Sequence, residues 1–155
     1  MLNLVEAAPH ILMVFMAVNR PIRSQVLDHY QIDYAIGTFD HEPSDYSSQA
    51  LSREKIFGLG HENLFNHAEL SMAQFLQYPH ILLDFRENNP TTISLLLQKK
   101  QLSRTILLQT KFISTIGQTL SAVPPLCAVP LLIAKPMLKL HPLKIYEIPL
   151  DLTYY

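Results

Sequence analysis

The sequence predicts an α/β fold built on a largely parallel sheet. Short apolar runs, for example 80–83 and 105–108, have the length of strands that are buried on both faces. Between these runs, apolar residues recur at helical spacing, as Ile93, Leu96 and Leu97 do. Strands that alternate with helices of this length are typical of βαβ units. With 155 residues, 48% of them hydrophobic, the chain can form one ordinary core or two small lobes.

The first third of the chain is expected to contribute two buried strands and the helix between them. Residues 2–8 have the pattern of the last turn of a helix, and 11–18 is predicted to be a strand. Asn19 then caps a helix over 22–30, whose apolar residues lie on one face. A second buried strand follows at 32–37. The order resembles part of a parallel sheet without its first strand.

The middle of the chain alternates polar loops with short elements. Residues 40–50 are polar and predict a loop, and 54–59 predicts a strand that crosses to the second half of the chain. A polar connection at 61–68 leads into a short helix over 70–76, for which Ser71 is the expected cap.

The last part of the chain carries the clearest alternation. Asn89 is expected to cap a helix that begins at Pro90, because proline at the first helical position loses no hydrogen bond. Phe112, Ile116 and Leu120 recur every four residues and predict the next helix. The remaining elements are a strand at 126–129, a helix whose first position is Pro130 and which Pro136 kinks or ends, and a strand at 143–148.

Charge and cysteine content exclude several classes of protein. The net charge of −1 gives no electrostatic reason to expect nucleic-acid binding by this chain itself. Cys127 is the single cysteine, so no intrachain disulfide can form, which favours a reducing cytoplasm. The apolar run at 11–18 is too short to span a bilayer.

The motifs that could carry catalysis or metal binding are weak. Ser52 and Lys55 match a Ser-x-x-Lys pattern, but the companion motifs of acyl enzymes are absent. His61 and His67 are six residues apart, whereas a helical metal pair needs a spacing of four. Gly58 and Gly60 lack the third glycine of a dinucleotide-binding loop. We therefore expect no catalytic residues, no metal and no cofactor, and we do not expect an enzyme.

The predicted sheet indicates where a ligand would bind. In open parallel sheets, ligands bind beyond the carboxyl ends of strands, where helix N-termini offer free N–H groups. The loops at this edge would be 19–20, 38–39, 85–92 and 111–115. Their side chains either cap their own helices or present donors to a small anion. These side chains are Asn89, Thr91, Thr92, Ser114 and Thr115.

Six short segments, spread over nearly the whole chain, match motifs of one protein family in the right order. They are Gln31–Gly37, Leu51 with Arg53–Glu54, Gly60–Leu64, Leu70–Leu76 with Tyr78–Ile81, Leu102–Arg104, and Leu126–Pro130. On these segments, the chain resembles the effector-binding domain of LysR-type transcriptional regulators.

The resemblance implies a type II periplasmic-binding-protein fold, in which crossing strands join two α/β lobes and a small effector binds between them. By position, residues 1–60 would form part of lobe one with the hinge crossing, 61–148 lobe two, and 149–155 the start of the return to lobe one. The effector would be a small molecule, with anions as one candidate class. The residues facing the cleft would be Asn19, Phe39, Phe85, Thr91, Phe112 and Ile113.

The resemblance also implies a homodimer and a separate winged helix-turn-helix that binds DNA. This sequence lacks that motif, the linker helix, the first strand of lobe one and the final return into it. We expect a truncated module that senses a ligand but cannot bind DNA by itself. A missing edge strand leaves unpaired backbone, which predicts a homodimer or a higher oligomer. A free-standing small-molecule binding protein of the same fold is the alternative, and an enzyme on this sheet ranks last.

Overall fold

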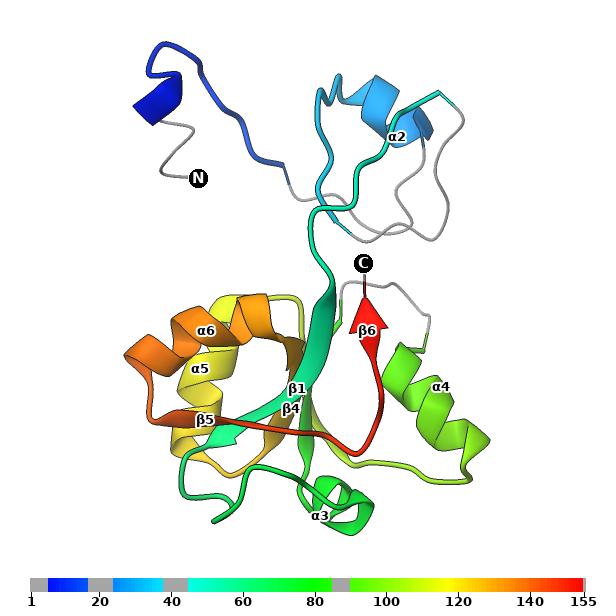
Figure 1. Cartoon of the computed structure of the whole chain (residues 1–155), viewed down its shortest axis with the longest axis vertical. Coiled ribbons are helices and arrows are strands. Elements are labelled where there is room, and N and C mark those ends of the chain that lie inside the picture. Colours follow the sequence, from blue (N-terminus) through cyan, green and yellow to red (C-terminus); the bar gives the residue numbers. More distant parts are fainter. Residues whose placement is uncertain (1–5, 17–23, 38–44, 85–89, 155) are drawn as a thin grey trace.

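The computed structural model describes residues 6–16, 24–37, 45–84 and 90–154, and these form a mixed α/β fold (Figure 1). Six strands make one sheet in the order β3-β2-β4-β1-β5, with β6 paired to β1. The strands are β1 Glu54–His61, β2 His80–Leu83, β3 Ile106–Thr110, β4 Leu126–Pro130, β5 Leu143–Tyr146 and β6 Thr153–Tyr154. The helices are α2 Ser24–His29, α3 Met72–Gln77, α4 Thr92–Lys99, α5 Ile113–Ala122 and α6 Leu131–Leu140.

The sheet is mixed, whereas a largely parallel one was expected, because β1 runs against its neighbours. β2 runs parallel to β3 and to β4. β1 lies between β4 and β5 and is antiparallel to both, so β4 and β5 run in the same direction. The strands β2 to β5 follow one another through α4, α5 and α6 and run in the same direction, whereas the connection from β1 to β2 through α3 leaves β1 running the opposite way. The position of β1 between β4 and β5 was not predicted.

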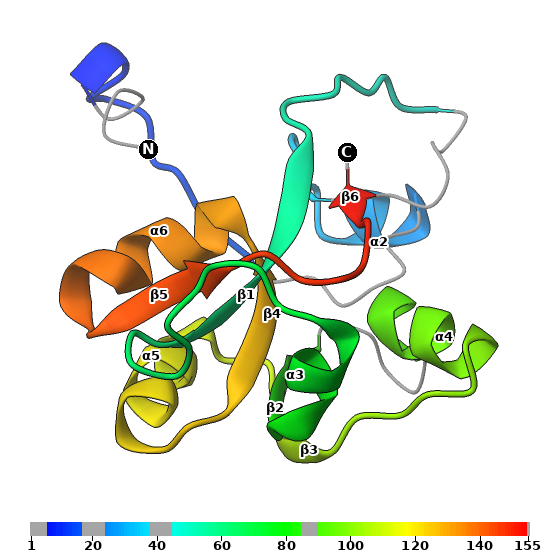
Figure 2. The same cartoon turned by 60° about the horizontal axis from the view of Figure 1, so that its bottom comes forward.

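Helices cover both faces of the sheet and enclose two apolar clusters. Phe75, Ile93 and Leu97 form one cluster with residues of β1 and β5, beneath α3 and α4. Ile116 and Ala134 belong to the other cluster, beneath α5 and α6. Figures 1 and 2 show α5 and α6 together on one side of β1 and β4, with α4 on the other side. Because successive side chains of β1 point to opposite faces of the sheet, this strand contributes residues to both clusters.

The capping residues explain where the helices begin. Ser71 caps α3 as predicted, because its hydroxyl accepts from the Gln74 N–H while the Gln74 side chain accepts from the Ser71 N–H. The expected start of α4 at Pro90 was two residues too early, because the helix begins at Thr92 and Thr91 is its cap.

The two prolines of α6 also differ from expectation. Pro130 is the N-cap of α6 and still belongs to β4, so it is not the first helical residue. Pro136 lies inside α6 and does not end it. The carbonyl of Leu132, which loses its partner to this proline, lies on an exposed turn of the helix, where water can replace the lost hydrogen bond.

The N-terminal part confirms the predicted helix α2 but not the two predicted strands. Residues 11–16 and 32–37 form no strand, and their apolar side chains are exposed, to 87% at Leu12 and 91% at Tyr34. A buried strand needs a hydrogen-bonded neighbour and a covering layer, and among the described residues these segments have neither. In Figure 1 this part of the chain lies beyond the start of β1, away from the main sheet.

Candidate functional site

The carboxyl ends of β2 and β3 meet at one edge of the sheet. The Asp84 N–H donates to the carbonyl of Thr110 (3.0 Å), which continues the pairing of the two strands by one residue. The nearly buried Asp84 carboxylate accepts from Nε2 of Gln109 at 3.0 Å. This edge therefore carries an acidic side chain that already accepts a hydrogen bond from Gln109, together with the turn that leads into α5.

The turn from β3 into α5 closes on itself and leaves apolar side chains outside. The Phe112 N–H donates to Oγ1 of Thr110 at 3.0 Å, and the Thr115 hydroxyl donates to the Phe112 carbonyl at 2.8 Å. Because these bonds satisfy the backbone of the turn, its shape does not depend on a ligand. Phe112 is 70% exposed and Ile113 is 40% exposed. The turn thus offers a ready apolar contact for a ligand at the strand ends.

The N-terminus of α4 carries another of the predicted site residues, Thr91. The Thr91 hydroxyl accepts from the Ser94 N–H at 3.3 Å, and the two hydroxyl oxygens lie 2.9 Å apart. Nη2 of Arg104 also donates to Oγ1 of Thr91, at 3.4 Å. The capping interpretation of Thr91 is therefore correct. The same hydroxyl also connects the helix start to a guanidinium group.

The structure describes three of the six residues that the resemblance predicted for the site. Phe112 and Ile113 lie together at the β3–α5 turn. Thr91 lies on α4, and its hydrogen bonds go to Ser94 and Arg104, not to that turn. The other three lie outside the described residues. They are Asn19, Phe39 and Phe85.

Three further polar residues at or behind this edge were not predicted. Asp84 follows a buried strand directly, which is the position where a polar residue marks the carboxyl edge of a sheet, and this signal was available in the sequence. Gln109 directly follows the apolar run at 105–108, so the same signal was available for it. Arg104 was noted only as part of a motif, since its reach to Thr91 depends on the packing of α4 over the sheet.

The positive charge of this half of the chain is concentrated in one long segment. From Pro90 to Tyr146 there are seven basic residues and no acidic residue. The basic residues are Lys99, Lys100, Arg104, Lys111, Lys135, Lys139 and Lys144. Burial lowers the pKa of Arg104. This charge distribution favours acidic partners for the second half of the chain.

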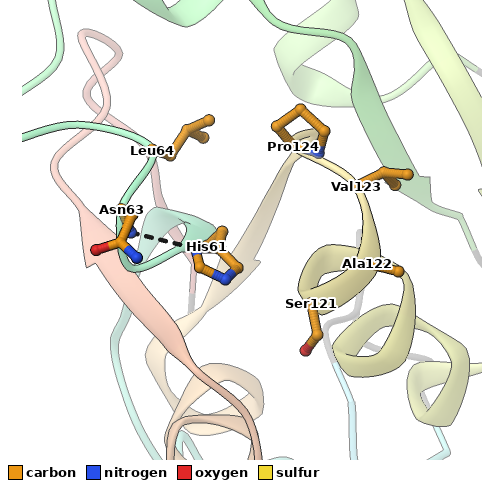
Figure 3. A pocket seen from close by; sticks show the side chains of 7 residues that line it. All are labelled: His61, Asn63, Leu64, Ser121, Ala122, Val123 and Pro124. Atoms are coloured by element: carbon orange, nitrogen blue, oxygen red, sulfur yellow. Dashed lines mark hydrogen bonds between the residues drawn. The ribbon is translucent and has the colours of Figure 1, made fainter.

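A hollow of about 250 Å³ lies at the opposite end of the sheet (Figure 3). It is located between the loop after β1 and the end of α5, because the reversed β1 brings His61 to the amino end of β4. The His61 ring accepts from the Asn63 N–H at 3.2 Å, and the Ser121 hydroxyl donates to the Gly117 carbonyl at 2.7 Å. The side chains of His61 and Ser121, which line the hollow, are thus hydrogen-bonded within the fold. The hollow is separate from the predicted site.

The weak motifs have structural roles. Lys55 pairs with Glu147, and the Ser52 hydroxyl donates to Glu54, so the two residues of the Ser-x-x-Lys pattern contact different partners. In the part of the chain that the structure describes, no group of three or more His, Cys, Asp or Glu residues could hold a metal ion. No described helix is both long and apolar enough to cross a membrane.

Comparison with known proteins gives one family match. The model of the LysR substrate binding domain matches residues 3–155. A comparison with curated protein sequences finds no match.

Three solved structures illustrate the likeness in fold. A probable transcriptional regulator from Pseudomonas aeruginosa has a TM-score of 0.84 and 18% identity, over 98% of this chain and 51% of that one. The regulatory domain of MexT, a transcriptional activator in the same organism, has a TM-score of 0.78 and 18% identity, over 99% of this chain and 76% of the MexT chain. The regulatory domain of MetR, a LysR family regulator from N. meningitidis, has a TM-score of 0.69 and 14% identity, over 98% of this chain and 71% of the MetR chain. This chain thus spans about half the length of the first structure.

Proposed function

This chain belongs to the LysR substrate-binding domain family, a family of non-enzymatic regulatory domains, and on that premise we propose how it acts. It is the ligand-sensing and dimerisation domain of a LysR-type transcriptional regulator, and a small effector binds between two lobes. The family match over residues 3–155 is the observation that carries this proposal. Contact with DNA belongs to a helix-turn-helix domain separate from these residues, and the site of action is the cytoplasm.

The proposed lobes are residues 1–60 for part of lobe one with the hinge crossing, 61–148 for lobe two, and 149–155 for the start of the return to lobe one. The pairing of β6 with the first residues of β1 supports this division. Glu54 pairs with Tyr154 and Lys55 with Thr153, so the outgoing and returning segments run side by side. Figure 1 shows β6 running toward the N-terminal part of the chain, beside the first residues of β1, which runs in the opposite direction.

The proposed effector site consists of Asn19, Phe39, Phe85, Thr91, Phe112 and Ile113. Three features of the described residues support it. Phe112 and Ile113 are exposed at a turn whose backbone is already satisfied, and Thr91 lies at a helix N-terminus. The surrounding segment is basic. An effector with an acidic group and an apolar body fits this combination, because helix N-termini and basic groups attract anions while aromatic side chains bind apolar surface.

A ligand-binding experiment tests this site. We would measure the melting temperature of the chain against a panel of small aromatic and aliphatic carboxylates. We expect at least one carboxylate to raise the melting temperature, since a ligand that binds only the folded state stabilises it. The double variant Thr91→Ala with Phe112→Ala should lose that rise. The matched control is Leu140→Ala, which removes an exposed apolar side chain at the far end of α6 and should retain it. Loss of the rise in both variants, or in neither, would contradict the site.

We also propose that the chain forms homodimers or higher oligomers. Charge supports this: residues 1–89 contain eleven acidic and five basic residues, whereas residues 90–146 contain only basic ones. The exposed side of α6 adds apolar surface, with Leu132 and Leu140 beside Lys135 and Lys139. An acidic first half and a basic, partly apolar second half are complementary between two copies of the same chain.

A further inference from the structure

The hollow at the amino end of β4 is lined from two sides. His61, Asn63 and Leu64 lie on one side, and residues 121–124 at the end of α5 lie on the other (Figure 3). Its volume is about 250 Å³. Pockets for drug-sized ligands measure about 300–1,000 Å³, so this hollow suits a smaller molecule.

The end of α5 leaves backbone carbonyl groups without donors. In a helix, the carbonyl of each residue accepts from the N–H four residues later, and the carbonyls point toward the C-terminal end. The carbonyl of Ser121 would accept from residue 125, but Pro125 has no N–H. The carbonyl of Ala122 would accept from Leu126, whose N–H donates instead to the carbonyl of Pro79 at 2.9 Å. Among the described residues, no backbone N–H donates to either carbonyl, so the hollow has two acceptors at this side.

The opposite side of the hollow offers a donor on a well-held residue. Nδ1 of His61 accepts from the Asn63 N–H at 3.2 Å, so this nitrogen carries no proton and Nε2 carries it. The carbonyl of His61 accepts from the Tyr146 hydroxyl at 2.7 Å and from the Leu64 N–H at 3.0 Å. These hydrogen bonds fix the residue from both directions of the chain. The His61 ring therefore presents an N–H donor at Nε2, away from Asn63.

A ligand that satisfies both sides needs an acceptor for His61 and donors for the two carbonyls. A primary carboxamide carries one carbonyl oxygen and two N–H groups on adjacent atoms. A carboxylate has no N–H, and the negative end of the α5 dipole repels it. An ammonium group has no acceptor for Nε2 of His61. Leu64, Val123 and Pro124 add apolar surface for the rest of the ligand, and Val123 is 42% exposed.

We propose that this hollow is a second ligand site, which binds a small molecule with a primary carboxamide group and a short apolar chain. The carboxamide oxygen accepts from Nε2 of His61, and the carboxamide N–H groups donate to the carbonyls of Ser121 and Ala122. This site goes beyond the proposed function, because it lies at the opposite end of the sheet from the predicted effector residues and takes a ligand without charge.

Nuclear magnetic resonance of the full wild-type chain tests the site with three probes of similar size. Propionamide should shift the amide resonances of Leu64, Ala122 and Val123 in a saturable way. Butanone keeps the carbonyl and the apolar chain but has a methyl group in place of the NH₂, so it should bind at least about threefold more weakly. Propylamine, which is protonated at neutral pH, has no acceptor for His61 and should also bind more weakly. These comparisons need no variant, so they do not depend on how a substitution affects folding.

A substitution then tests the donor. His61→Phe keeps an aromatic ring but removes Nε2, and it should weaken propionamide binding about threefold to tenfold. His10→Phe is the matched control, since it makes the same change at an exposed histidine outside the hollow and should leave the binding unchanged.

Four results would overturn the site. They are no saturable shift with propionamide, equal binding of butanone and propionamide, unchanged binding in His61→Phe, and an equal loss in His10→Phe. None of these results bears on the proposed effector site, which is tested with carboxylates.

Discussion

At the scale of single residues, this domain depends on a few polar groups buried in an apolar core. Tyr146 is fully buried, and its hydroxyl donates to the carbonyl of His61 at 2.7 Å, which ties β5 to the loop after β1. His80 ties the start of β2 to the end of α3 in the same way, through the carbonyl of Phe75. A buried group that must stay neutral makes the stability of the domain depend on pH.

The first prediction concerns His80 and acid. Its pKa is lowered to about 4 in the folded chain, against 6.5 for a free histidine. As pH falls below 6.5 the unfolded state therefore binds a proton that the folded state does not, and stability is lost down to about pH 4. We expect the free energy of unfolding in urea to fall by about 2 kcal/mol between pH 7 and pH 5. His80→Leu should be less stable at pH 7 but should lose this part of the pH dependence, whereas the exposed His10→Gln should keep it. An equal pH dependence in His80→Leu and wild type would contradict the assignment.

At the scale of secondary-structure elements, short helices depend on their ends and on close approaches. α3 has six residues, fewer than an isolated helix needs to form, so its capping box and the burial of Phe75 stabilise it. α5 approaches the end of α6 closely at Gly117, where an added Cβ would lie 2.5 Å from Cδ2 of His141. These two contacts give one prediction each.

The second prediction concerns the cap of α3. Ser71→Ala removes the acceptor of the Gln74 N–H and breaks the capping box, which should lower the free energy of unfolding by about 1 kcal/mol. Chemical denaturation measures this value. Ser103→Ala is the control, since it truncates an exposed serine outside any helix and should change stability by less than about 0.5 kcal/mol. Equal effects of the two variants would show that the capping box contributes nothing.

The third prediction concerns the packing of α5 against His141. Gly117→Ala adds a Cβ that clashes with the His141 ring, and we expect a loss of about 1–3 kcal/mol despite the better helix propensity of alanine. In a His141→Ala background the clash is gone, so the same substitution should be neutral or stabilising by up to about 1 kcal/mol. Urea denaturation of the four variants completes the cycle. A destabilisation that persists unchanged in the His141→Ala background would mean that another contact is responsible.

At the scale of the whole molecule, the N-terminal part of the chain differs from the rest in its net charge and in how far its apolar side chains are buried. The strands and helices from β1 onward form one sheet with helices on both faces, whereas the described residues before β1 leave apolar side chains exposed, such as Leu12 and Tyr34. The two halves also carry opposite net charge. Association between copies would bury apolar surface and pair unlike charges at the same time.

The fourth prediction concerns this association. Sedimentation velocity should show a species larger than the 17.7 kDa monomer at low ionic strength, and its fraction should fall as salt rises, because salt screens exposed charges. The double variant Lys135→Glu with Lys139→Glu should weaken the association further, since it reverses the charge of the α6 surface. Lys99→Glu with Lys100→Glu is the matched control on α4. A monomer at every concentration and salt would contradict the proposed oligomer.

The sequence by itself determined the elements of the second half, the cap at Ser71 and the family, because these depend on local patterns. Apolar periodicity, capping side chains and short motifs act within a few residues of each other, so the order of strands and helices from β1 to β5 could be predicted. Phe112 was predicted to share the apolar face of α5 with Ile116 and Leu120, but it is the N-cap of this helix and is exposed. The interpretation of Thr91 as a cap of its own helix was correct because capping is local, although the first helical residue was misplaced.

Only the tertiary structure decided which strands pair, which apolar segments are covered, and which polar groups meet. The reversed β1 between β4 and β5 brings together residues some seventy to ninety positions apart, and its periodicity carries no sign of direction. The segments 11–16 and 32–37 have the composition of buried strands, but burial requires a partner that composition does not specify. Arg104 and Thr91 meet because α4 folds back over the sheet. Contacts of this kind depend on how the chain packs. The free energy of a contact depends on both surfaces that meet, whereas a sequence pattern describes only one of them.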